Sequence, residues 1–111
     1  MGIGVPMIGG GGGGDFTVVP YTAPSTWPYT IAAADYVVLI DTSVARTTIL
    51  PSAVTNPGRV LIIKDNVGSA ATNNVTVASA AGNVDGAASY TMNINWQSIT
   101  VVSNGTNWRV V

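Results

Sequence analysis

The chain has 111 residues, a formal net charge of −1 and only 8% charged residues, about a third of the ~25% usual for soluble domains. It has no histidine or cysteine, no basic tract that could follow a phosphate backbone, and no apolar run approaching the ~20 residues of a membrane span. We therefore expect no nucleic acid, membrane, cofactor or metal as a partner. A domain this small, without disulfides, is expected to gain stability by oligomerisation.

Residues 1–29 are rich in glycine and proline and are expected to form an extended N-terminal arm. Glycine fills positions 9–14. Apolar side chains nevertheless recur along this segment, which is unusual for a linker, so we interpret it as an arm that lies on a partner surface. A disordered tail is the alternative that composition permits. The expected anchors are Ile3, Val5, Met7, Ile8, Phe16, Val18, Tyr21 and Trp27.

Residues 30–111 have the pattern of an all-β domain. Short strand-like runs alternate with clusters of Gly, Pro, Asn, Asp or Ser about every ten residues, which is typical of a compact sandwich, a barrel or a β-solenoid-like knob. No segment has a sustained helical period. The expected strands span 36–41, 47–50, 59–64, 74–78, 89–94, 98–103 and 106–111.

The run Val60–Ile63 is predicted to be a central strand. Four aliphatic residues in succession leave no polar face, so we expect both faces of this strand to be covered. Pro57 and Gly58 form the turn that precedes it, because proline fixes φ and glycine tolerates positive φ.

The C-terminal strands are predicted to form a hairpin, because Asn104-Gly105 is the preferred two-residue hairpin turn. In that register Ser103 faces Thr106, Val101 pairs with Trp108, and Ile99 pairs with Val110. The large apolar side chains then share one face of the hairpin. Thr100 and Arg109 lie on the other face.

Catalytic chemistry is nearly absent from the sequence, and we expect no enzymatic activity and no catalytic residue. Without Glu, His or Cys, the candidate acids and metal ligands are aspartates. Asp35, Asp41, Asp65 and Asp85 lie at expected strand ends, where Asp ordinarily caps turns. A paired-Asp glycosidase site or a calcium site is the alternative.

Large aromatic residues are the remaining candidates for a binding site. Tyr90, Trp96 and Trp108, together with Trp27 in the arm, could stack on a glycan. Core or subunit-contact positions are the more common use of such residues.

Several short motifs in residues 30–111 together resemble a β-rich module of tailed-bacteriophage appendage, head-fibre and capsid decoration proteins. The resemblance implies a trimeric virion structural protein without enzymatic activity. The motifs are Asp41-Thr42-Ser43, Leu50-Pro51, Asn56-Pro57-Gly58-Arg59, Ile63-Lys64-Asp65, Ala71-Thr72-Asn73-Asn74-Val75-Thr76, Asp85-Gly86-Ala87-Ala88-Ser89 and Ser103-Asn104-Gly105-Thr106-Asn107-Trp108.

The combination of a trimeric knob with an apolar arm favours a capsid decoration, or cement, protein. In this interpretation the partner is the major capsid protein of a phage shell, the location is the capsid exterior of the virion, and the arms stabilise the shell. The alternative is a receptor-binding knob of a head or tail fibre that holds a host glycan on exposed aromatic residues. A polysaccharide depolymerase is a third and weaker hypothesis, because catalytic groups are lacking.

Overall fold

The computed structural model describes residues 20–111, and all regular secondary structure in that range is β-strand. The all-β prediction is therefore confirmed for this part of the chain. No helix long and apolar enough to span a membrane occurs among these residues. The strands are β1 (Tyr21–Thr22), β2 (Tyr29–Thr30), β3 (Val37–Ile40), β4 (Arg46–Leu50), β5 (Val60–Asp65), β6 (Val75–Ser79), β7 (Ser89–Met92), β8 (Ser98–Ser103) and β9 (Trp108–Val110).

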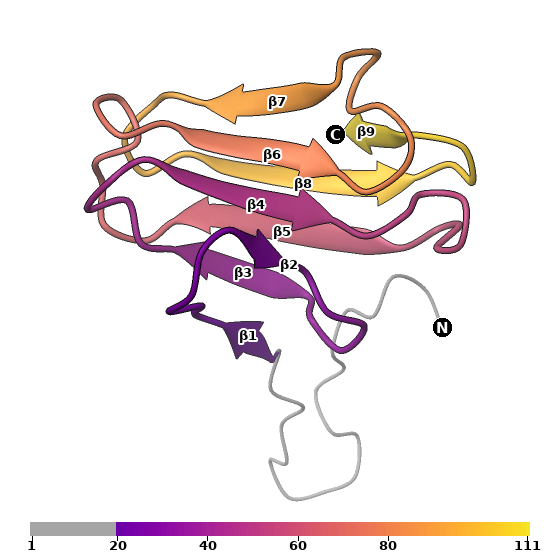
Figure 1. The fold of residues 1–111 in the computed structure, drawn as a ribbon, viewed down its shortest axis with the longest axis horizontal. Coiled ribbons are helices and arrows are strands. Elements are labelled where there is room, and N and C mark those ends of the chain that lie inside the picture. Colours follow the sequence, from indigo (N-terminus) through magenta and orange to yellow (C-terminus); the bar gives the residue numbers. More distant parts are fainter. Residues whose placement is uncertain (1–19) are drawn as a thin grey trace, which may run out of the picture.

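The strands form two sheets, and the chain alternates between them from β1 to β6. One sheet has the order β1-β3-β5-β8-β9 and the other has the order β2-β4-β6-β7 (Figure 1). The pairs β1–β3, β3–β5, β2–β4 and β4–β6 are all parallel. The first six strands thus follow a coil in which each turn adds one strand to each sheet. The last three strands, β7, β8 and β9, pair antiparallel and complete both sheets.

The first turn of this coil lies within the predicted arm. β1 pairs with β3, β2 pairs with β4, and Tyr29 packs against the core. Asp35 joins the two short strands, because it accepts hydrogen bonds from the Thr22 hydroxyl at 2.6 Å and the Tyr29 hydroxyl at 2.5 Å. Burial and the bond to Asp35 raise the pKa of Tyr29 to about 12. Residues 20–29 are therefore part of the two-sheet fold, whereas residues 1–19 lie outside the described range.

The core lies between the sheets and is almost entirely aliphatic, with Trp108 as its largest member. Strand residues alternate between this core and the outside, as the pleat requires. The buried hydrophobic residues of the core are Ile31, Val38, Ile40, Leu50, Ala53, Leu61, Ile63, Val75, Val77, Val84, Met92, Ile99, Val101 and Trp108.

β5 is the middle strand of its sheet, so its predicted central position is confirmed. The single chain covers only one of its faces, so the expectation that both are covered stays a prediction. Leu61 and Ile63 are fully buried, whereas Val60 and Ile62 between them are only half-buried. An unbroken apolar run shows that both faces are apolar, but it does not show that a second layer packs on each.

The C-terminal hairpin forms with a different register from the predicted one. Ser103 pairs with Trp108 and Val101 pairs with Val110, so four residues rather than two form the connection. The Asn104 side chain explains the longer turn, because its Oδ1 accepts hydrogen bonds from the backbone of Thr106 at 3.0 Å and of Asn107 at 2.8 Å. The register shift is two residues, which preserves the face of every side chain. Trp108 and Val101 therefore still point into the core.

Candidate functional site

Asp65, at the end of β5, is a buried polar centre that joins several loops. This carboxylate is fully buried and accepts hydrogen bonds from the Thr42 hydroxyl at 2.7 Å and from four backbone N–H groups. Those N–H groups belong to Val67, Gly68, Ala70 and Trp96. Burial opposes ionisation of Asp65, but the hydrogen bonds outweigh it and hold the pKa of the carboxyl well below its ordinary value.

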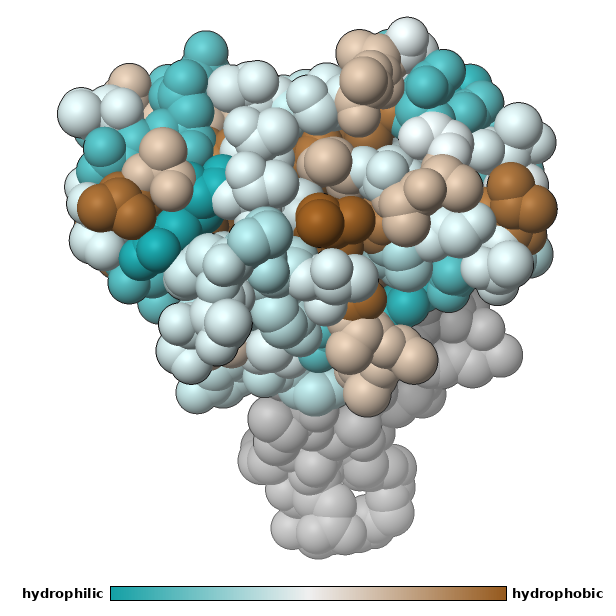
Figure 2. Space-filling model, in the orientation of Figure 1, coloured by the Kyte–Doolittle hydropathy of each residue, from teal (hydrophilic) through white to brown (hydrophobic). Residues whose placement is uncertain are grey.

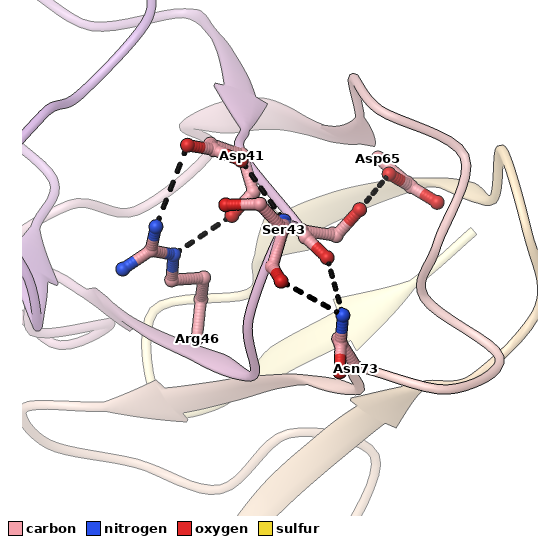
Figure 3. Close-up of polar contacts among 6 residues, drawn as sticks. Asp41, Ser43, Arg46, Asp65 and Asn73 are labelled. Carbon is pink, nitrogen blue, oxygen red and sulfur yellow. Dashed lines mark hydrogen bonds and ion pairs between the residues drawn. The ribbon is translucent and has the colours of Figure 1, made fainter.

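Asp65 thereby joins three loops, 41–45, 66–74 and 93–97, which we call the Asp65 end. They lie together at the left in Figure 1. Figure 3 shows further ties between two of them: the Asn73 amide donates to the carbonyls of Thr42 at 2.9 Å and Ser43 at 3.1 Å. Beside these bonds, Asp41 pairs with Arg46 at 3.4 Å. The Asp65 end is consequently a set of fixed loops.

These contacts also decide what the aspartates can do chemically. The predicted turn-capping role is confirmed for Asp41, which accepts from the Ser43 N–H at 2.9 Å, and for Asp65. No group of three or more His, Cys, Asp or Glu residues that could hold a metal ion is present in residues 20–111. The described aspartates are thus engaged in holding loops and strands.

Trp96, one of the predicted contact residues, projects from the Asp65 end. It is 58% exposed and its backbone has a φ of 65°, in the left-handed region. Its N–H donates to Asp65 Oδ2 at 2.9 Å, and its carbonyl accepts from the Lys64 ammonium. The indole lies directly on Gly68, where a methyl group would be 2.3 Å from Trp96 Cε2. The ring therefore has a defined position on the surface.

The loop that carries Trp96 is held by Gln97. The Gln97 side-chain oxygen accepts from the N–H groups of Asn93 at 2.9 Å and Ile94 at 3.2 Å. Its backbone carbonyl accepts from the N–H of Asp65 at 2.8 Å. Nearby, the Asn95 side-chain oxygen accepts from the Ala71 N–H at 2.9 Å. Loops 66–74 and 93–97 are therefore fastened to each other.

The other predicted contact residues differ from Trp96. Trp108 is 0% exposed and its indole N–H donates to the Pro51 carbonyl at 2.9 Å, so it presents no face to a ligand. Tyr90 is half-buried against the core. The structure therefore leaves Trp96 as the most exposed ring of these three.

The expected arm anchors fall into two groups. Trp27 is half-buried against the core, with the Arg46 guanidinium 5.0 Å from its ring centroid, and Tyr21 is an exposed residue of β1. The remaining anchors lie outside the described residues: Ile3, Val5, Met7, Ile8, Phe16 and Val18.

A second candidate surface, which sequence reasoning did not identify, is the outer side of the five-stranded sheet. We define the outer apolar face as Val37, Leu39, Val60, Ile62 and Val102. These residues come from the neighbouring strands β3, β5 and β8 and are all half-buried. Across the sheet Val37 pairs with Ile62, and Val60 with Val102. The signal in the sequence was the loss of alternation in Val37–Ile40, Val60–Ile63 and Val101-Val102.

No protein-family model matches the chain, and no curated protein matches it in sequence.

Proposed function

We propose that this protein is a virion structural protein, a homotrimeric decoration or cement protein of a phage head shell. The observation that carries the proposal is the outer apolar face, which covers three adjacent strands and has only half-buried side chains. Contiguous apolar patches of this kind mark sites of protein association. The resemblance of residues 30–111 to modules of phage decoration proteins supplies the class of assembly.

The subunits meet through the outer apolar face in this proposal. Its charged neighbours are few: Lys64 lies in the row of Leu39, and Arg109 in the row of Val60 and Val102. When a second and a third copy cover the face, apolar area is removed from water, and no unpaired charge is buried at the centre of the contact. The exposed Tyr21, which pairs with Val37 at the edge of the same sheet, extends this contact.

Attachment to the shell is assigned to residues 1–19. This segment continues directly into β1, at one edge of the five-stranded sheet, and its sequence combines the apolar residues Ile3, Val5, Met7 and Ile8 with the glycine run 9–14. A trimer carries three such segments. Three individually weak contacts on one particle act at high effective concentration and give firm attachment, with the major capsid protein as the partner.

The test uses the full chain with Ile3, Val5, Met7 and Ile8 replaced by Ser. The variant should remain trimeric by analytical ultracentrifugation, and its affinity for head particles stripped of this protein should fall at least about tenfold in co-sedimentation. The matched control replaces Val44 and Val54, exposed residues of the knob, by Ser and should bind normally. Full occupancy by the first variant would refute the attachment role, and a monomeric wild-type protein would refute the trimer.

A further inference from the structure

The backbone of Trp96 has a conformation that is unusual for tryptophan. A φ of 65° is unusual for any residue other than glycine, and it is a true outlier for a bulky one. Glycine or asparagine would occupy this position freely. Since the indole is 58% exposed, its burial in the core does not compensate for the strain. Residues held in such conformations gather at ligand-binding sites.

Asp85 is the other described non-glycine residue with a positive φ, at 50°, and it provides a contrast. Aspartate is one of the residues that tolerate this region, and the Asp85 carboxylate accepts the N–H of Val110 at 3.0 Å. The local structure therefore explains Asp85. It accounts for the backbone of Trp96 through the bond to Asp65, but not for the presence of an indole there.

The surroundings of the ring are polar and fixed. Asn93 and Asn95 are exposed in the same loop, and the Asn95 amide is oriented by its bond from Ala71. The Lys64 ammonium is held by the Trp96 carbonyl and lies over the ring, 5.9 Å from its centroid. A ligand that docks here meets an aromatic ring and an ammonium group in a hydrogen-bonded loop that also exposes two amides, so little loop entropy is lost on binding.

We propose that Trp96 is the stacking platform of a carbohydrate site at the Asp65 end, which takes a pyranose unit. The C–H face of a pyranose ring fits a flat indole, and its hydroxyl groups fit the amides of Asn93 and Asn95. Gly68 serves the site by letting the indole lie against its backbone. This inference does not depend on the role in a phage shell, because it uses only residues 64–71 and 93–97.

The test is a titration of the full protein with tetramers of glucose, N-acetylglucosamine and galacturonic acid up to about 10 mM, well above the ~1 mM dissociation constant expected for a single platform. Binding is followed by the indole N–H signals in NMR spectra. We expect at least one tetramer to shift the Trp96 signal, while the buried Trp108 signal stays in place.

Three variants sharpen the test. Trp96→Ala should weaken binding at least about tenfold, and Trp96→Phe should retain part of it, since stacking needs a ring. Ile94→Ala is the matched control: Ile94 is 62% exposed in the same loop but has no flat face, so this change should leave binding intact. Failure of all three tetramers to bind, or equal losses in the Ile94 and Trp96 variants, would overturn the proposal. So would a change in oligomeric mass on Trp96→Ala, which would make Trp96 a subunit contact.

Discussion

The two sheets of this protein present outer faces of opposite character. On the four-stranded sheet the outer face is mainly polar. Thr47, Thr76 and Thr91 form one row across β4, β6 and β7. The next row contains Thr30 and one large apolar residue, Ile49. Figure 2, which shows the side that carries β4 and β6, is accordingly pale and teal with brown in separate spots. The five-stranded sheet instead carries the outer apolar face defined above.

A chain with 8% charged residues thus divides its surface between a face rich in hydroxyl groups and an apolar face. Hydroxyl groups keep one face hydrated without charge, and they also favour the extended backbone of a strand. The other face uses aliphatic residues, which suit strands equally well. Strand propensity is therefore similar on both faces, and only polarity distinguishes the face that we propose for association.

The largest effect is expected on trimer formation, when a charged residue is placed on the outer apolar face. Ile62→Lys places a charge at the centre of the proposed contact, where desolvation would weaken trimer formation more than about 100-fold. Thr76→Lys makes the same change at the centre of the polar face and should leave the trimer intact. Analytical ultracentrifugation over a dilution series measures both. Dissociation of the Thr76 variant alone would show that the subunits meet through the opposite face.

The next effect compares two neighbours in β5. Ile63 is fully buried, so Ile63→Ala should lower the free energy of unfolding by about 4 kcal/mol, because it leaves a cavity. Ile62→Ala should cost less than about 1 kcal/mol in the dissociated subunit, since its side chain points to the outer face. Urea unfolding at low protein concentration gives both values. At high concentration the cost of Ile62→Ala should rise, and a concentration-independent cost would argue against association through this face.

A smaller loss of stability is expected at the Asp65 end, which belongs to neither outer face. Asp65→Asn keeps the shape but turns an amide donor toward the N–H groups, and it should cost about 3 kcal/mol at neutral pH. Asp41→Asn is the control, because the Asp41 side chain is 48% exposed and its replacement should cost far less stability than Asp65→Asn. Urea unfolding at pH 7 measures both, and equal losses would contradict a special role of the buried carboxylate.

The buried Asp65 carboxylate also makes the stability of the protein depend on pH. The pKa of Asp65 is lower in the folded than in the unfolded state, so its stabilisation is present above the ordinary value of 3.8 and is lost as the pH falls through the folded-state pKa. Wild-type stability should therefore decline on acidification below about pH 4. The Asp65→Asn variant should show a flatter decline. An identical acid profile would mean that other carboxylates dominate.

Sequence reasoning located the strands that have a strong apolar pattern, from β3 to β9, but it did not find β1 and β2. Each of these strands has two residues and lies among prolines, so no periodicity marks it. A β-solenoid-like arrangement was among the expected folds, but its repeat could not be identified in the sequence, because the spacing between paired residues varies. Tyr21 pairs with Val37, whereas Val37 pairs with Ile62, so no repeat length exists to be detected.

The candidate site was predictable only in part. Trp96 was among the aromatic candidates, and the hairpin pattern placed Trp108, which is fully buried, on an apolar face, but no pattern indicated that Trp96 is exposed. The difference arises from backbone geometry: Asp65, thirty-one positions earlier, binds the Trp96 N–H, and Gly68 receives the ring. Such long-range contacts leave no local pattern. Similarly, the apolar runs in β3, β5 and β8 indicate a shared outer face only when these strands are known to be neighbours in one sheet.

The lengths of the strands at the sheet edges have a consequence for what kind of assembly can form. The four edge strands, β1, β2, β7 and β9, have 2, 2, 4 and 3 residues, whereas β5 and β8 in the interior have 6 each. Short edges offer few free backbone groups to a foreign strand, which limits edge-to-edge sheet growth of the amyloid type. The sheet edges in residues 20–111 therefore disfavour open fibrils in a domain that has few charges to keep copies apart.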